Sequence, residues 1–91
     1  MNGRIHILVY GKVQGVFFRQ NAKELASGLG IKGYTKNLED GSLEIIAEGP
    51  NQKLDEFIEF CKKGPNGASV ESAKITYDEY KNEFEDFEIR H

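Results

Sequence analysis

Residues 4–13 (RIHILVYGKV) and the stretch after them decide the fold, because the spacing of apolar residues changes between the two. In the first stretch the odd positions, Ile5 to Val13, form one face, and His6, Leu8, Tyr10 and Lys12 form the other, which is the pattern of a strand with one buried face. From about residue 19 the apolar residues recur at helical spacing, at Ala22, Leu25, Ala26 and Leu29. Gly28 and Gly30 supply stop signals, so the sequence predicts a strand followed by a helix of about three turns.

The remaining segments complete a recognisable order of elements. Residues 31–37 and 42–49 read as a hairpin around the turn residues Asp40 and Gly41. A second helix follows Pro50, and residues 69–80 and 84–90 read as two closing strands. Two helices with one apolar stripe each cannot cover both faces of so small a sheet. We therefore expect one domain over residues 1–91 with a ferredoxin-like α+β fold: a βαββαβ sandwich with a mainly antiparallel sheet, both helices on one face and an additional C-terminal strand.

The charge is unevenly distributed along the chain. The net charge is −3, but residues 1–37 carry +5 and residues 38–91 carry −8. An acidic total argues against nucleic acid as a partner, whereas a small anion held by the N-terminal half is compatible with it. No apolar run suggests export or a membrane span, and the single Cys61 cannot form an internal disulfide, so we expect a cytoplasmic protein without a membrane partner.

Few side chains are suited to acid–base, nucleophilic or metal chemistry. Cys61 lies on the apolar stripe of the second predicted helix, where a buried thiol is expected. His6 and His91 lie far apart in the sequence, and the carboxylates are scattered in the pattern of a solvated surface. The sequence therefore predicts no metal site and no cofactor.

The loop that joins the first strand to the first helix is a candidate anion site. It covers residues 14–19, with Gly15 free to adopt a positive φ, and it ends on Arg19 in the first turn of the helix. A helix N-terminus already carries partial positive charge and unpaired N–H groups, so a cation belongs there only if an anion lies between them. The alternative is an ordinary turn with a solvent-exposed arginine, and the residues alone leave both open.

Two longer motifs resemble the acylphosphatase family. Residues 11–19 (GKVQGVFFR) and 33–49 (GYTKNLEDGSLEIIAEG) carry the resemblance, together with KKGP at 62–65 and the F-x-I pattern at 87–89. The family's usual GYVRN is GYTKN here, with Thr35 and Lys36 at the changed positions, and Gln20 also departs from the family pattern. The resemblance implies a hydrolase with catalytic residues Arg19 and Asn37, Arg19 binding phosphate and Asn37 orienting water. It also implies a phosphate-binding loop of six residues: Gln14, Gly15, Val16, Phe17, Phe18 and Arg19.

The resemblance implies hydrolysis of acyl phosphates to a carboxylate and inorganic phosphate, without a metal. Inorganic phosphate is then both product and inhibitor, and the protein is expected to be a monomer. An amide such as Asn37 holds water but does not take its proton near neutral pH, which suits a substrate with a good leaving group. Two alternatives remain: a non-catalytic anion-binding module that uses the same loop, and a nucleic-acid reader that would need Tyr10 and Tyr34 on an open sheet face.

Overall fold

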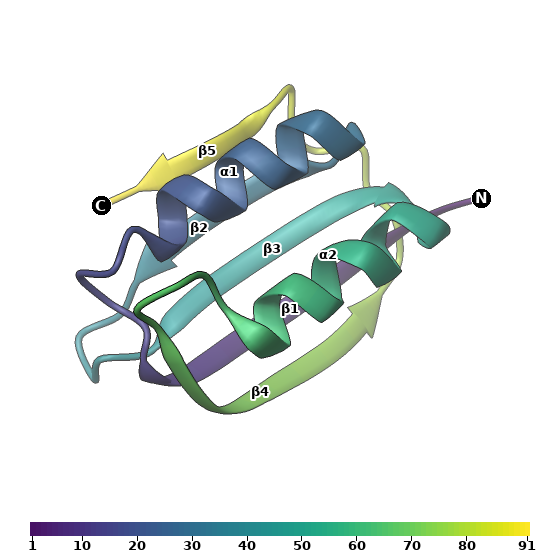
Figure 1. The fold of residues 1–91 in the computed structure, drawn as a ribbon. Coiled ribbons are helices and arrows are strands. Elements are labelled where there is room, and N and C mark those ends of the chain that lie inside the picture. The colour runs from purple at the N-terminus through teal and green to yellow at the C-terminus, as the bar shows by residue number, and fades with distance from the viewer.

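A computed structural model describes residues 1–91, and its elements follow the predicted order (Figure 1). The elements are β1 (Asn2–Lys12), α1 (Phe18–Leu29), β2 (Lys32–Asn37), β3 (Leu43–Pro50), α2 (Asn51–Lys63), β4 (Ser69–Asp78) and β5 (Phe87–Arg90). The two closing strands are shorter than predicted, because residues 79–86, which are mostly polar, form a loop between them.

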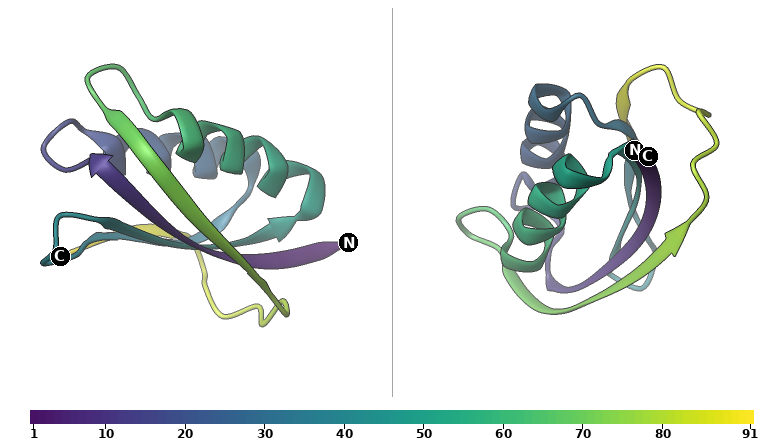
Figure 2. Two further views of the ribbon diagram at one scale, coloured as in Figure 1. Left: turned by 90° about the horizontal axis from the view of Figure 1, so that it is seen from below. Right: turned by 90° about the vertical axis from the view of Figure 1, so that its right-hand side faces the viewer.

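The five strands form one sheet with the order β4-β1-β3-β2-β5. Neighbouring strands are antiparallel except β2 and β5, which run parallel. Both helices lie on the same face of the sheet, as the two turned views show (Figure 2). The predicted ferredoxin-like α+β arrangement with an additional C-terminal strand is confirmed.

The core fills the space between the sheet and the helices. Sixteen buried apolar residues form one cluster, and most of them come from both helices and from β1, β3 and β5, while β4 contributes partly buried residues. The alternation predicted for the first strand is confirmed, since Ile5, Ile7 and Val9 are fully buried. Cys61 is also buried as predicted, and burial raises the pKa of its thiol, which keeps it protonated and unreactive.

Helix α1 begins and ends on residues with left-handed backbone angles. It begins at Phe18, directly after Phe17 with φ 58°, and it ends before Gly30 with φ 72°. The N–H groups of Gly30 and Ile31 bond to carbonyls of the last turn, which is a common way to end a helix. Of the two predicted stop signals, Gly30 ends the helix and Gly28 lies inside it.

A buried carboxylate fixes the loop that leads into β5. Glu48 is 2% exposed and accepts hydrogen bonds from the backbone N–H groups of Lys81 (2.7 Å) and Glu83 (3.0 Å). Arg4 donates to the same carboxylate at 3.1 Å. Burial alone would raise the pKa of Glu48, but these donors outweigh it and hold the pKa below its ordinary value. The fixed loop therefore places β5 beside the edge of β2 that β3 leaves free.

Candidate active site

The loop between β1 and α1 contains two left-handed residues, Gly15 (φ 72°) and Phe17 (φ 58°). Glycine accepts this angle without strain, but a bulky residue there costs about 1–3 kcal/mol. The carbonyl of Phe17 accepts two hydrogen bonds from Asn21, one from the backbone N–H (3.0 Å) and one from the side-chain amide (2.9 Å). These bonds lock the strained peptide in place, and alternating backbone angles of this kind turn successive N–H groups toward one side of the loop.

The N-terminus of α1 has no side chain to satisfy its N–H groups. Phe17 occupies the N-cap position without a capping bond, and no acidic residue lies in the first turn. Four N–H groups at a helix start lack intrahelical partners, and the helix dipole adds about half a positive charge there. This end of the helix is therefore suited to an anion that is not part of the chain.

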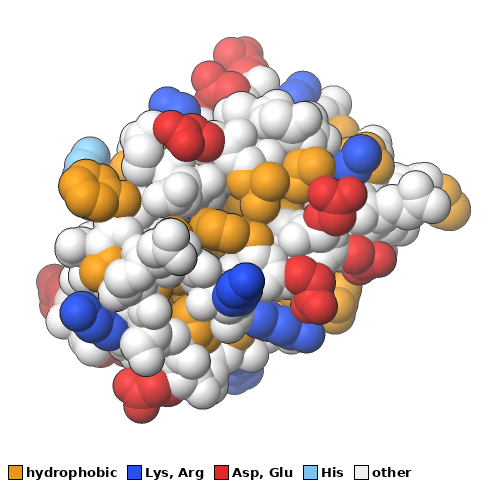
Figure 3. Space-filling model, viewed as in Figure 1, with side chains coloured by type: hydrophobic (Ala, Val, Ile, Leu, Met, Phe, Trp, Pro, Cys, Tyr) orange, Lys and Arg blue, Asp and Glu red, His pale blue; other side chains and the backbone are white.

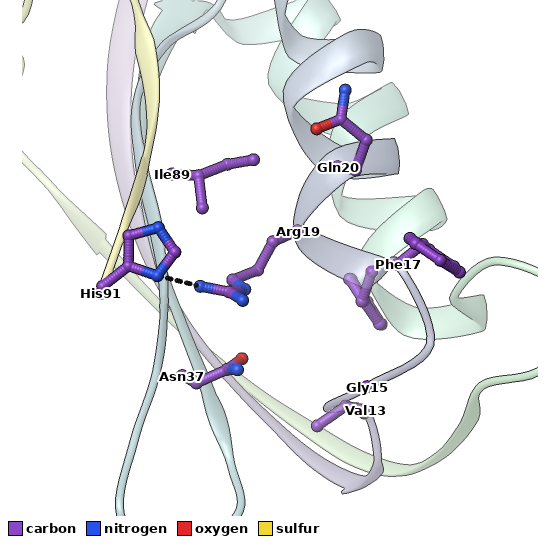
Figure 4. A pocket seen from close by; sticks show the side chains of 9 residues that line it. Val13, Gly15, Phe17, Arg19, Gln20, Asn37, Ile89 and His91 are labelled. Carbon is purple, nitrogen blue, oxygen red and sulfur yellow. Dashed lines mark hydrogen bonds between the residues drawn. The ribbon is translucent and has the colours of Figure 1, made fainter.

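Arg19 adds a full positive charge at the same place. Its Nη1 donates to the backbone carbonyl of Arg90 at 3.2 Å and lies 3.4 Å from Nδ1 of His91. Arg19 makes no ion pair with any carboxylate of the chain. Figure 4 shows its guanidinium between His91 and Asn37. The chain thus holds an uncompensated cation beside an uncapped helix start.

Asn37 is the last residue of β2 and lies on the helix side of the sheet. Its side chain donates and accepts no hydrogen bond within the protein, and its Oδ1 is buried without a partner. Leaving a buried polar atom unsatisfied costs about 1–3 kcal/mol, and such atoms recur at catalytic sites. The amide is therefore available to a small polar molecule bound beside it.

Gln14 and the turn at residues 38–42 hold Asn37 in position. The Gln14 side-chain amide donates to the carbonyls of Leu38 and Ser42, both at 2.9 Å. The turn is also closed by Ser42, whose hydroxyl and backbone N–H bond to Asp40 and hold the pKa of that carboxyl below its usual value. The side chain of Gln14 thus braces the loop against the β2–β3 turn instead of lining the pocket.

These residues surround an open pocket of about 400 Å³ (Figure 4). It is lined by Val13, Gly15, Phe17, Phe18, Arg19, Gln20, Asn37, Ile89 and His91. No carboxylate lines it, and no group of three or more His, Cys, Asp or Glu residues in the chain could hold a metal ion. The pocket is thus built for a small anion, held by positive charge and N–H groups.

The structure brings Arg19 and Asn37 together in this pocket, with Gly15, Phe17 and Phe18 from the predicted loop. Val16 and Gln14 do not line it. Phe18 is only 1% exposed and its ring packs edge-on against Phe60, so its side chain belongs to the core. Val13, Ile89 and His91 also line the pocket, although no local feature of the sequence predicts that they do. Ile89 and His91 are placed there by the pairing of β2 with β5.

The opposite face of the sheet is chemically separate from the pocket. Lys36 is paired across the strands with Glu44, and Glu44 also bonds to His6 (2.9 Å) and to the Tyr34 hydroxyl (3.0 Å). Burial and the bond to Glu44 raise the pKa of Tyr34. Arg90 covers the Tyr34 ring at 4.2 Å, so this ring is not free to stack on a base. Because side chains alternate along a strand, the Lys36 side chain lies on the face away from Asn37.

Three comparisons with known proteins agree. A family model described as Acylphosphatase matches residues 5–89. The acylphosphatase of Pyrobaculum islandicum is 47% identical over 89 residues, which are 97% of this chain and 94% of that protein. The crystal structure of acylphosphatase from Bacillus subtilis has a TM-score of 0.93 and 34% identity, with 100% of both chains covered. The acylphosphatase from Coxiella burnetii has a TM-score of 0.92 and 34% identity, over 98% of this chain and 93% of that one.

Proposed function

The chain belongs to the acylphosphatase family, and from this premise we propose which residues carry the reaction: the loop at residues 14–19 and Arg19 bind the phosphoryl group, and Asn37 orients the attacking water. The activity itself is hydrolysis of acyl phosphates to a carboxylate and inorganic phosphate. The proposal rests on one observation: Arg19, which makes no ion pair, lies beside the uncapped start of α1 and in the same pocket as Asn37.

The phosphoryl end of the substrate is placed by charge. Its oxygens would lie between the N–H groups of the loop, the start of α1 and the guanidinium of Arg19. A planar fork of donors matches phosphate oxygens, and the carbonyl of Arg90 limits how far the fork can swing. In phosphoryl transfer the charge spreads over these same oxygens, so fixed donors stabilise the transition state without reorganising.

The water is placed by the Asn37 amide, which has no competing partner in the protein. An amide cannot take a proton near neutral pH, so the water attacks as a weak nucleophile. The reaction proceeds because the carboxylate is a good leaving group and needs no acid. The water proton passes to a phosphoryl oxygen of the substrate, the P–O bond to the acyl group breaks, and the products are a carboxylate and inorganic phosphate.

His91 lies in the pocket but is not the base in this proposal. Its Nδ1 lies 3.4 Å from Nη1 of Arg19, so this ring nitrogen is turned toward the guanidinium. Loss of a general base typically costs about a hundred- to ten-thousandfold in rate. His91→Ala should therefore cost far less than that, because the Arg90 carbonyl still holds Arg19.

Several further properties are part of the same proposal. One core cluster with residues from both helices and three strands supports a single domain over residues 1–91. Five large apolar side chains are exposed, and only two of them, Tyr77 and Tyr80, are near neighbours in the sequence; the others are Met1, Tyr10 and Phe17, and this spread supports a monomer. A single buried cysteine suits the cytoplasm.

No helix of the structure has the length and hydropathy needed to cross a membrane. Lys, Arg, Asp and Glu are interspersed on the helix face (Figure 3), which does not favour nucleic acid.

The test is phosphate release from a synthetic acyl phosphate, measured for the parent and for Asn37→Ala. We expect turnover by the parent after exhaustive chelation, competitive inhibition by inorganic phosphate, and loss of most turnover in Asn37→Ala with phosphate affinity kept within a few fold. An anion-binding module without catalysis would bind phosphate equally in both proteins and release none. Full activity in Asn37→Ala would remove this residue from the mechanism.

A further inference from the structure

Phe17 occupies a position that neither the core nor the local backbone explains. The residue is 79% exposed, although it lines the pocket. It sits at the N-cap of α1, where small polar residues are preferred, and it provides no capping bond. Its left-handed φ of 58° is one that Gly or Asn adopts far more readily than an aromatic residue. A strained, exposed aromatic residue at an active site is a reason to look for a function.

Phe17 is the main apolar surface that the pocket presents to a ligand. Four apolar side chains line the pocket, but Val13 and Phe18 are each 1% exposed and are closed off by the core. Ile89 is partly buried on β5. A substrate in the pocket can therefore gain apolar contact chiefly from the ring of Phe17.

The direction of the reaction places the acyl group on the Phe17 side. In an in-line displacement the leaving group departs from the side of the phosphorus opposite the attacking water. If Asn37 holds the water, the acyl group extends away from the end of β2. Figure 4 shows Phe17 across the pocket from Asn37, at the start of α1. The acyl end of the substrate thus leaves the phosphate loop along this side chain.

We propose that Phe17 is a specificity-determining residue that contacts the acyl group and makes the enzyme prefer acyl phosphates with an aromatic or bulky apolar acyl group. This inference rests on the function proposed above. The backbone of Phe17 is fixed at the rim, because Asn21 holds its carbonyl with two hydrogen bonds, and the ring is carried there with it. An aromatic side chain has only two rotatable bonds, so it offers a large apolar contact area at a small entropic cost on binding.

The experiment compares kcat/KM for benzoyl phosphate and acetyl phosphate in the parent, Phe17→Asn, Phe17→Gly and Phe17→Tyr. Asn and Gly both tolerate the left-handed backbone, so they remove the ring and keep the loop. Tyr keeps the aromatic surface. A substitution that affects binding of the phosphoryl end affects both substrates alike, so it cancels in the ratio of the two kcat/KM values. The two substrates also differ in intrinsic reactivity, but this difference is the same for every variant and cancels when the ratios of variants are compared.

We expect the benzoyl-to-acetyl ratio to fall about three- to tenfold in Phe17→Asn and Phe17→Gly and to stay near the parent value in Phe17→Tyr, since apolar contacts at a rim discriminate less than those in a closed pocket. Two unreactive isosteres, phenacylphosphonate and acetonylphosphonate, provide a second readout. The inhibition constants of these two compounds should converge in the Asn and Gly variants.

A ratio unchanged in both the Asn and Gly variants would overturn the role of Phe17 and leave the proposed function intact. A parent that hydrolyses neither substrate would overturn the proposed function, and this inference with it. Circular dichroism of each variant checks that the fold is kept.

Discussion

Replacing Arg19 by alanine removes the one cation of the pocket, and we expect turnover to collapse while the fold remains. The Coulomb attraction between two unit charges about 4 Å apart is about 4 kcal/mol at an effective dielectric constant of about 20. Removal of one fixed donor to transition-state charge typically costs about 2.7–4 kcal/mol, or roughly a hundred- to a thousandfold in rate. Because no carboxylate pairs with Arg19, none of this loss is offset by relief of an internal ion pair.

The fold should tolerate the change, since the Arg19 side chain bonds only to the Arg90 carbonyl and to His91. Loss of such exposed bonds costs about 0.5–1.5 kcal/mol of unfolding free energy each at most. The assay is kcat/KM on a synthetic acyl phosphate, with phosphate inhibition and urea unfolding measured on the same protein. Arg19→Lys is the matched control: it keeps the charge but loses the planar fork and should recover only part of the activity. Turnover of Arg19→Ala within a few fold of the parent would refute the placement of the phosphoryl group.

Three other changes probe the amide, the core and the buried carboxylate. Asn37→Asp should lower both turnover and phosphate affinity, because it puts a negative charge near a dianionic substrate; an Asp variant as active as the parent would show that a base, not orientation, limits the rate. Thr35→Val should raise the free energy of unfolding by about 1 kcal/mol without changing turnover, because the Thr35 hydroxyl is buried with no partner; a drop in denaturant midpoint would contradict this. Glu48→Gln should destabilise the protein near pH 7 by about 3 kcal/mol, since it breaks a buried ion pair. The pKa of Glu48 is lowered on folding, so the parent holds this stability above the unfolded pKa of about 4.3 and loses it as pH falls through the lower folded value. The Gln variant should therefore show a flatter acid-unfolding curve, and parallel curves would exclude the linkage.

The parts of the structure that could be predicted from sequence are those set by short-range periodicity. The alternation of Ile5, Ile7 and Val9 and the change to helical spacing after Arg19 are local, and both match the structure. The arginine at the helix start suggested an anion site by electrostatics, but the residues alone left an ordinary turn open as the alternative. Asn37 needed the family resemblance, because an asparagine before a turn is common for purely structural reasons.

The parts that could not be predicted depend on pairing over long stretches of chain. Ile89 and His91 enter the pocket because β5 adds in parallel to the edge of β2, more than fifty residues earlier in the sequence. The place of Gln14 in the loop predicts contact with phosphate, yet its side chain bonds to the β2–β3 turn, 24 and 28 residues away in sequence. The strained backbone of Phe17 leaves no sequence signal, since propensity favours other residues there.

Because strand β5 is short, the active site is less stable to heat or denaturant than the rest of the fold. The strand pairs with β2 through only four residues, and Phe87 alone among them is anchored in the core. Local opening of residues 88–91 would release Arg19 while both helices and the other strands stay packed, so heat or urea should abolish activity before it unfolds the protein. The same opening bares the edge of β2, where Lys32 and Lys36 discourage another chain from pairing with it. Opening of β5 should therefore inactivate the protein reversibly, without leading to aggregation through the exposed edge of β2.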